Sequence, residues 1–315
     1  MKLRYLLTVG AALHSLALAA DPGLLSLIPP DSKAVAGIEV AQARTSPFGQ
    51  YLLSHMPSNG FNPSQNLSEI VVATDGAPKA PSNHWLMAGT GAFDIPKLTA
   101  AAEAGGGTVS SFKGVDIVTR PAGQAEQLPT AIAFLGSSTG IMGDPASVQA
   151  AIQQWQNKAA PNNALLGKVN QVSGNQDFWF VTLVPVSDLT AALPPGTNLG
   201  RSNAANVLAG VNQLSGGVHF GSTVTLSAEA VARSDKDAQA LADVVRFAAS
   251  VVELNRQNNP MAGQLAAVLD TLDAKTSGNL ATFSLAVPEQ QLEQLLPNGG
   301  PASSHTRRKV LPQVK

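Results

Sequence analysis

Residues 136–140, GSSTG, follow the pattern G-x-S-x-G, in which many hydrolases hold a nucleophilic serine. Such a serine stands on a sharp turn between a strand and a helix, where N–H groups stabilise the oxyanion that forms during the reaction. The candidate nucleophile is Ser138. Asp188 and His219 follow it in the order of an α/β-hydrolase triad, so Asp188 is the candidate acid and His219 the candidate base.

The residues around Ser138 favour a hairpin turn over a nucleophile elbow. Thr130–Leu135 is apolar and predicts a strand, but only Ile141-Met142-Gly143 follows before Asp144-Pro145, the pair that begins the next helix. Gly-Ser-Ser-Thr-Gly between two apolar runs is typical of a tight turn. His219 lies in GGVHFG, which indicates the middle of a strand. We therefore expect no catalytic residues, with a serine hydrolase using Ser138 as the alternative.

The sequence does not indicate metal or cofactor binding. The chain has no cysteine, and the histidines beyond the leader (His55, His84, His219 and His305) have no partners at ligand spacing. Asp235 and Asp237 are typical of a helix start and lack the glycine and distal glutamate of a calcium loop. The glycine clusters are not followed by the Lys-Ser/Thr pair of a phosphate loop. We expect no metal, no cofactor, and tryptophans that serve the core, with a tryptophan-lined ligand groove as the alternative.

The first residues have the layout of a secretory signal peptide. Lys2 and Arg4 form a basic start, and an apolar run follows that is shorter than the roughly 20 residues a membrane span needs. Ala17-Leu18-Ala19 then offers small residues at the positions that a signal peptidase reads. We expect cleavage after Ala19, with Ala20 as the next choice.

The absence of cysteine bears on the compartment. A bacterial lipoprotein needs a cysteine at its cleavage point, so lipid anchoring is excluded. Secreted eukaryotic proteins of this size usually carry disulfides. The sequence therefore predicts a periplasmic or secreted bacterial protein.

Composition limits the class of partner. The formal net charge is −1 and only 13% of residues are charged, and removal of the leader takes away two of the basic residues. This balance gives no electrostatic drive toward nucleic acid or an anionic membrane. No later apolar run approaches the length of a membrane span. We expect an envelope protein or a small molecule as the partner.

Both halves of the chain alternate strands with helices. In the second half, apolar and polar residues alternate along Ser222–Ala232, so one face is buried and one is wet, as in antiparallel sheets. Residues 157–176 are polar and are read as the link between the halves. The expected strands are 34–40, 69–74, 85–90, 108–112, 115–119, 130–135, 141–143, 178–184, 217–221, 222–232 and 280–287. The expected helices are 47–56, 94–105, 144–155, 186–193, 202–214, 234–256, 261–272 and 289–296.

These elements predict an α+β fold of antiparallel sheets with helices packed on one face, in two similar-sized halves. The predicted divisions are a signal peptide at 1–19, an N-terminal domain at 20–160, a C-terminal domain at 161–298 and a disordered basic tail at 299–315. Two segments resemble each other, VPVSDL at 184–189 and VPEQQL at 287–292, with AFDIPKL at 92–98 as a looser copy. Internal duplication and the shared chemistry of strand-to-helix turns both account for this echo.

Three segments resemble secreted or periplasmic proteins of environmental bacteria that are uncharacterised. They are GIMGDPASVQAAI, SDKDAQALADVVRFAASVVEL and GNLATFSLAVPEQQLEQLL, and with the hairpin at 217–232 the resemblance spans about half the chain. No activity follows from it. The function expected from the sequence is non-enzymatic binding or interaction in the bacterial envelope. A small-molecule carrier with a cleft between the halves is the other alternative to the hydrolase.

Overall fold

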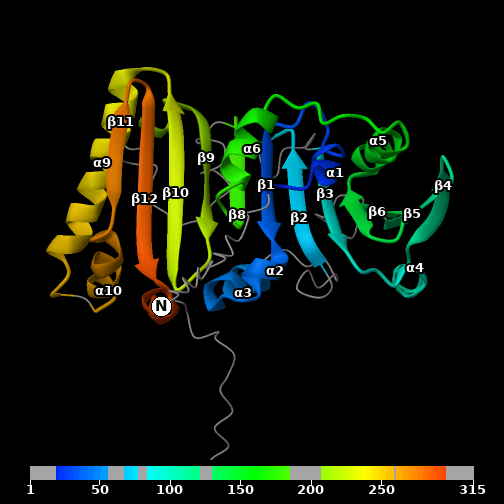
Figure 1. Ribbon diagram of the computed structural model, residues 1–315, viewed down its shortest axis with the longest axis horizontal. Coiled ribbons are helices and arrows are strands. Elements are labelled where there is room, and N and C mark those ends of the chain that lie inside the picture. Colours follow the sequence, from blue (N-terminus) through cyan, green and yellow to red (C-terminus); the bar gives the residue numbers. More distant parts are fainter. Residues whose placement is uncertain are drawn as a thin grey trace, which may run out of the picture.

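A computed structural model of the chain describes residues 19–55, 67–76, 84–120, 130–184, 207–258 and 260–295. The strands of these residues form one antiparallel sheet, in the order β11-β12-β10-β9-β8-β1-β2-β3-β7-β6-β5-β4 (Figure 1). The strands are β1 (Ala34–Glu39), β2 (Leu67–Thr74), β3 (Trp85–Gly91), β4 (Thr108–Phe112), β5 (Val115–Arg120), β6 (Thr130–Leu135), β7 (Thr139–Gly143), β8 (Phe178–Thr182), β9 (Val211–His219), β10 (Thr223–Ala232), β11 (Asp273–Ser277) and β12 (Leu280–Pro288).

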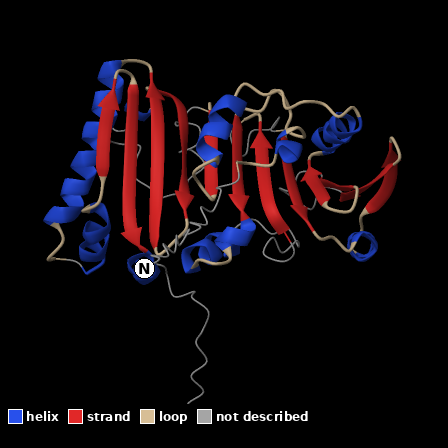
Figure 2. Cartoon of the chain, in the orientation of Figure 1, coloured by secondary structure: helices blue, strands red, loops and turns tan. Residues whose placement is uncertain are grey.

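Helices lie along and across this sheet, as the colours of Figure 2 show. Several begin at capping residues visible in the sequence: Ser46, Asp94, Asp144 and Ser234 each accept a backbone N–H bond from the first turn of a helix. The described helices are α1 (Pro22–Leu25), α2 (Val40–Ala43), α3 (Pro47–Ser54), α4 (Ile95–Ala104), α5 (Pro145–Gln156), α6 (Leu166–Ser173), α9 (Asp235–Leu254), α10 (Pro260–Leu269) and α11 (Glu289–Leu295).

The predicted α+β class with antiparallel strands in two similar-sized halves is confirmed. The sequence left open whether the two halves share a sheet. They do, because β1 of the first half pairs with β8 of the second at the centre of the sheet. Outward from this pair, one half runs β1-β2-β3-β7-β6 and the other β8-β9-β10-β12-β11, with β5 and β4 as an extra hairpin in the first. The topology therefore repeats. In this repeat, α4 follows β3 in the first half as α9 follows β10 in the second. The two segments that resemble each other in sequence, 184–189 and 287–292, instead follow β8 and include the end of β12, and these two strands are not equivalent in the repeat.

Side chains alternate between two cores on opposite faces of the sheet. Val71 belongs to the core beneath α1, α5 and α6, and the adjacent Ile70 belongs to the core beneath α2, α3, α10 and α11. We call these the α5 face and the α3 face. In the second half, the helix α9 packs against Ala230 and Ala281, and these side chains are on the α3 face of the sheet. Together the helices cover both faces of the sheet where the halves meet, and α9, α10 and α11 all lie on one face.

Some sequence expectations were wrong in detail. Residues 211–214 belong to strand β9, which pairs with β8 and β10, and not to a helix over 202–214. Residues 273–277 form the edge strand β11, where the sequence analysis expected no strand. The predicted link at 157–176 contains the helix α6. The signal peptide, the helix at 186–193 and the tail at 299–315 fall almost entirely outside the described residues and stay predictions.

No helix in the described ranges is long and apolar enough to cross a membrane.

Candidate functional site

The structure places Ser138 in the turn between β6 and β7, where its carbonyl oxygen accepts a hydrogen bond from the Gly91 N–H at 2.9 Å. No helix begins behind the serine, because α5 starts only at Pro145. His219 ends β9, and β8, β1, β2 and β3 lie between β9 and β7. At about 4.8 Å per strand, roughly 24 Å separates the two strands. Asp188 lies outside the described residues. Ser138 and His219, two residues of the alternative triad, are therefore not brought together.

His219 has a different partner. Its Nδ1 lies 2.9 Å from Oδ2 of Asp177, and that same oxygen accepts the N–H of Phe220 at 2.6 Å. Asp177 directly precedes β8, so the pair ties the start of β8 to the end of β9. Among the described residues, no group of three or more histidines and acids is placed to hold a metal ion.

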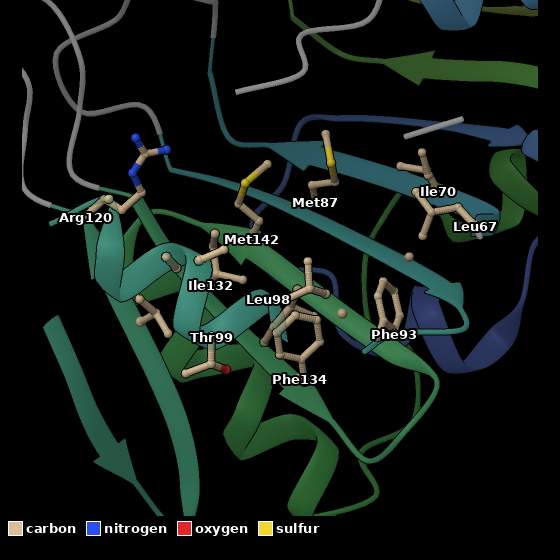
Figure 3. Close-up of a pocket in the computed structure, with 17 residues that line it drawn as sticks. Leu67, Ile70, Met87, Phe93, Leu98, Thr99, Arg120, Ile132, Phe134 and Met142 are labelled. Carbon is tan, nitrogen blue, oxygen red and sulfur yellow. The ribbon is translucent and has the colours of Figure 1, made fainter. Parts of the chain in front are cut away.

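A pocket with a volume of about 300 Å³ lies on the α3 face, between α4 and the strands β3, β7, β6 and β5 (Figure 3). Asp94 caps α4 by accepting the Lys97 N–H at 3.2 Å, and Pro96 occupies its first turn. No residue of α4 is fully buried. Ala101 and Ala102 of α4 line the pocket. Because their side chains are small, the helix lies over the sheet without filling the space beneath it.

The floor of the pocket contains two glycines that face each other across adjacent strands. Gly89 of β3 pairs with Gly140 of β7. A Cβ added to Gly140 would lie 3.1 Å from the Phe93 ring, and one added to Gly89 would lie 3.1 Å from the Glu69 carbonyl oxygen. The absence of side chains at this pair therefore leaves room for the pocket and lets Phe93 approach the sheet.

The lining is almost wholly apolar. Phe93 and Phe134 contact each other with ring centroids 5.3 Å apart, and Met87 and Met142 add flexible thioethers. Figure 3 shows Arg120 at one end of the pocket and Leu67 and Ile70 at the other. The full lining is Leu67, Ile70, Met87, Gly89, Phe93, Leu98, Thr99, Ala101, Ala102, Gly105, Val118, Arg120, Ile132, Phe134, Gly140, Ile141 and Met142.

Sequence reasoning missed this pocket. The alternative of a carrier expected an apolar cleft between the halves, whereas the pocket lies within the first half. No short motif marks it, because its residues come from six elements (β2, β3, α4, β5, β6 and β7) whose adjacency is decided by strand order. The only local signals were the glycines of the MAGTG segment (Gly89 and Gly91) and the alanine-rich helix after Asp94.

A second hollow of about 570 Å³ lies between α1 and the end of α5. Its lining includes Asp21, Gln154 and Lys158, and Trp155 there is 43% exposed. Trp155 therefore lies outside the core in which the tryptophans were expected, whereas Trp179 is 2% exposed and lies within it. This hollow is wider and more polar than the pocket beneath α4, and it has fewer apolar walls to enclose a molecule. We take the pocket beneath α4 as the candidate site.

Comparison with known proteins identifies the fold and nothing more specific. No family model and no curated protein sequence matches the chain. Solved structures of TP0453 are similar to it. Crystal form III has a TM-score of 0.56 and 9% identity and covers 87% of this chain and 97% of that chain. Crystal form IV has a TM-score of 0.53, again with 9% identity, and covers 87% and 96%. Crystal form I has a TM-score of 0.51 with 9% identity and covers 88% and 98%.

Proposed function

We propose that the chain is an exported, non-enzymatic binding protein whose pocket beneath α4 holds an apolar or amphipathic small molecule. The observation that carries the proposal is the lining, in which two phenylalanines, two methionines and aliphatic side chains enclose a glycine floor. A volume of about 300 Å³ lies at the lower end of the range of small-molecule sites. The leader pattern at residues 1–19 supports export to the bacterial envelope.

The ligand class follows from the lining. Apolar walls stabilise a bound molecule in proportion to the apolar surface they remove from water, about 25 cal/mol per Å². Methionine side chains repack around different shapes, so the pocket suits an alkyl chain or a fused ring better than a polar metabolite. Thr99 and Arg120 are the polar side chains of the lining. A polar head group would therefore lie toward the Arg120 end.

The alternative of a serine hydrolase has weaker support. Ser138 lies in a hairpin turn, and five strand spacings separate its strand from that of His219. The arrangement gives the hydroxyl no general base from His219.

The test is binding of a fluorescent apolar probe, N-phenyl-1-naphthylamine, to the purified chain starting at residue 20. We expect saturable binding with a blue-shifted emission, and displacement by fatty alcohols whose affinity rises with chain length until the pocket is full. Ala102→Phe, which places a ring in the pocket, should weaken binding at least about tenfold, or 1.4 kcal/mol.

The matched control is Ala100→Phe, on the same helix but exposed and outside the lining. It should bind like the wild type, and circular dichroism should show that both variants are folded. Equal binding by Ala102→Phe and the wild type would place the site elsewhere. The absence of any saturable binding to the wild type would refute an apolar binding function.

A further inference from the structure

Carboxylates gather on the α5 face where β1 and β2 meet α1. Glu39 and Glu69 lie directly opposite each other in the β1–β2 register, and Glu69 is only 6% exposed. Burial raises the pKa of Glu69 to about 7, with the charge of Glu39 as the next cause. Burial also raises the pKa of Glu39, followed by the charges of Asp177 and Asp21. Two facing carboxylates in a poorly solvated place disfavour each other's ionised form.

The nearest donors to Glu69 are backbone groups at the start of α1. The Asp21 N–H donates to both oxygens of Glu69 at 3.2 Å, and the preceding Ala20 N–H donates to Oγ of Ser173 on α6 at 3.2 Å. Ala20 is 2% exposed and belongs to the core beneath α1, α5 and α6. In the described parts of the chain, no Lys, Arg or His forms an ion pair with Glu39 or Glu69.

We propose that cleavage after Ala19 supplies the missing cation, and that the α-ammonium of Ala20 is held in a buried ion pair with Glu69 while bonded to Ser173. The inference rests on the proposed export. Water cleaves the Ala19–Ala20 amide and leaves a carboxylate on Ala19 and an amine on Ala20, which takes up a proton at neutral pH. The Ala20 nitrogen is one residue from the Asp21 nitrogen already bonded to Glu69, so it lies within about 7 Å of that carboxylate.

The chemistry of the nitrogen explains why cleavage matters. As an amide, the Ala20 nitrogen has one neutral N–H, and this N–H donates its hydrogen bond to Oγ of Ser173. As an ammonium, it has three donors and a charge, so it can keep the Ser173 bond and add a charge-assisted bond to Glu69. Ala20 is the first residue after the predicted cleavage point, and it is the first buried residue of the described part of the chain, since Ala19 is exposed. The fold thus places the new α-ammonium group of Ala20 beside the carboxylate of Glu69.

The experiment compares two versions of the chain, one beginning at Ala20 and one carrying Gly-Ser before Ala20, so that the nitrogen stays an amide. Each is made with Glu69 and with Glu69→Gln, and urea unfolding is measured at pH 7. We expect Glu69→Gln to lower the midpoint of the chain that begins at Ala20 and to leave unchanged or raise that of the extended chain. An equal shift in both versions would overturn the ion pair.

A second measurement reads the terminus directly. The α-amino group of Ala20 should react with an acetylating reagent at pH 7 at least about tenfold more slowly than a peptide with the same first residues, because a pKa raised by one unit leaves a tenth of the free amine. Glu69→Gln should remove much of this protection. Reactivity equal to that of the peptide would contradict the proposal.

Mass spectrometry of the chain recovered from the producing cell separates this inference from the proposed export. A terminus at Ala20 supports both. A terminus at Asp21 or beyond leaves export standing and overturns the ion pair. A terminus at Met1 overturns both the export and the ion pair. The binding of the probe by the pocket is tested independently of these two.

Discussion

At the junction of the two halves, the ring of Trp179 occupies the place where a side chain of residue 37 would stand. Gly37 on β1 pairs with Trp179 on β8, and a Cβ on Gly37 would lie 2.3 Å from Cζ2 of the indole. The indole is 2% exposed and packs into the core beneath α1, α5 and α6. A single missing side chain thus allows the halves to share a core across their central strand pair.

We predict that Gly37→Ala destabilises the chain by roughly 1–3 kcal/mol, because the added methyl overpacks a filled core. The matched control is Gly167→Ala on α6, where an added Cβ meets nothing within 4 Å. That change should raise the free energy of unfolding by about 0.5–1 kcal/mol, since alanine favours the helix. Urea unfolding measures both, and an unchanged midpoint for Gly37→Ala would contradict the close approach.

The buried Glu69 makes stability depend on pH in a chain whose Ala20 nitrogen is an amide. Burial and Glu39 raise the folded pKa of Glu69 from 4.5 to about 7, so the folded state holds this proton more tightly than the unfolded state in that window. The stabilisation that protonated Glu69 contributes is therefore fully present below about pH 4.5. It is lost as pH rises to 7, which lowers the free energy of unfolding by on the order of 2–3 kcal/mol. Glu69→Gln should flatten this slope in urea titrations, and a slope that persists in the variant would assign it to another group.

At the scale of elements, Asp144 connects the start of α5 to the neighbouring strand β3. Its carboxylate accepts the N–H groups of Ala146 and Ser147 at 3.1 Å, the Trp85 N–H at 2.9 Å and the Ser147 hydroxyl at 2.5 Å. Burial alone would raise the pKa of Asp144, but the bonds from Ser147 and Trp85 outweigh it and lower the pKa. The charged carboxylate thus acts as a helix cap and as a link between α5 and the sheet.

We predict that Asp144→Ala lowers the free energy of unfolding by about 2 kcal/mol, because it removes a cap and leaves partly buried donors without an acceptor. Asp94→Ala provides the comparison, since Asp94 is exposed and the one described bond to its carboxylate comes from the Lys97 N–H. That change should cost about half as much. Thermal unfolding followed by circular dichroism measures both, and equal losses would show that the link to β3 contributes nothing.

For the whole molecule, the central β1–β8 pair makes the two halves depend on each other. Separation at the predicted boundary between residues 160 and 161 would turn β1 and β8 into exposed edges and would uncover Trp179. Open edges of this kind favour aggregation. The described strands on the two sides of this boundary thus belong to one sheet.

We predict a single cooperative unfolding transition for the chain. Tryptophan fluorescence, which follows Trp85 and Trp155 in the first half together with the central Trp179, and far-ultraviolet circular dichroism, which follows the whole fold, should give coincident urea curves. Two separated transitions would show that the halves fold independently, and fragments 20–160 and 161–298 that each fold alone would lead to the same conclusion.

Local patterns in the sequence determined most of the strands and the starts of several helices. Apolar runs such as Thr130–Leu135 and capping pairs such as Asp144-Pro145 predict an element wherever they lie, because their effect needs only neighbouring residues. The hairpin turn at Ser138 followed from the same reasoning. The composition also indicated a chain without cysteine chemistry.

Only the tertiary structure decided the features that depend on pairing between distant segments. The spacing of apolar residues in 202–214 fits a helix, but β8 and β10 on either side place residues 211–214 in a strand. Asp273–Ser277 is polar and becomes a strand only because β12 offers it an edge. Likewise, the pocket beneath α4 and the facing pair Glu39 and Glu69 exist because the sheet order brings their strands together. Such contacts join residues far apart in the chain, and no local preference specifies them.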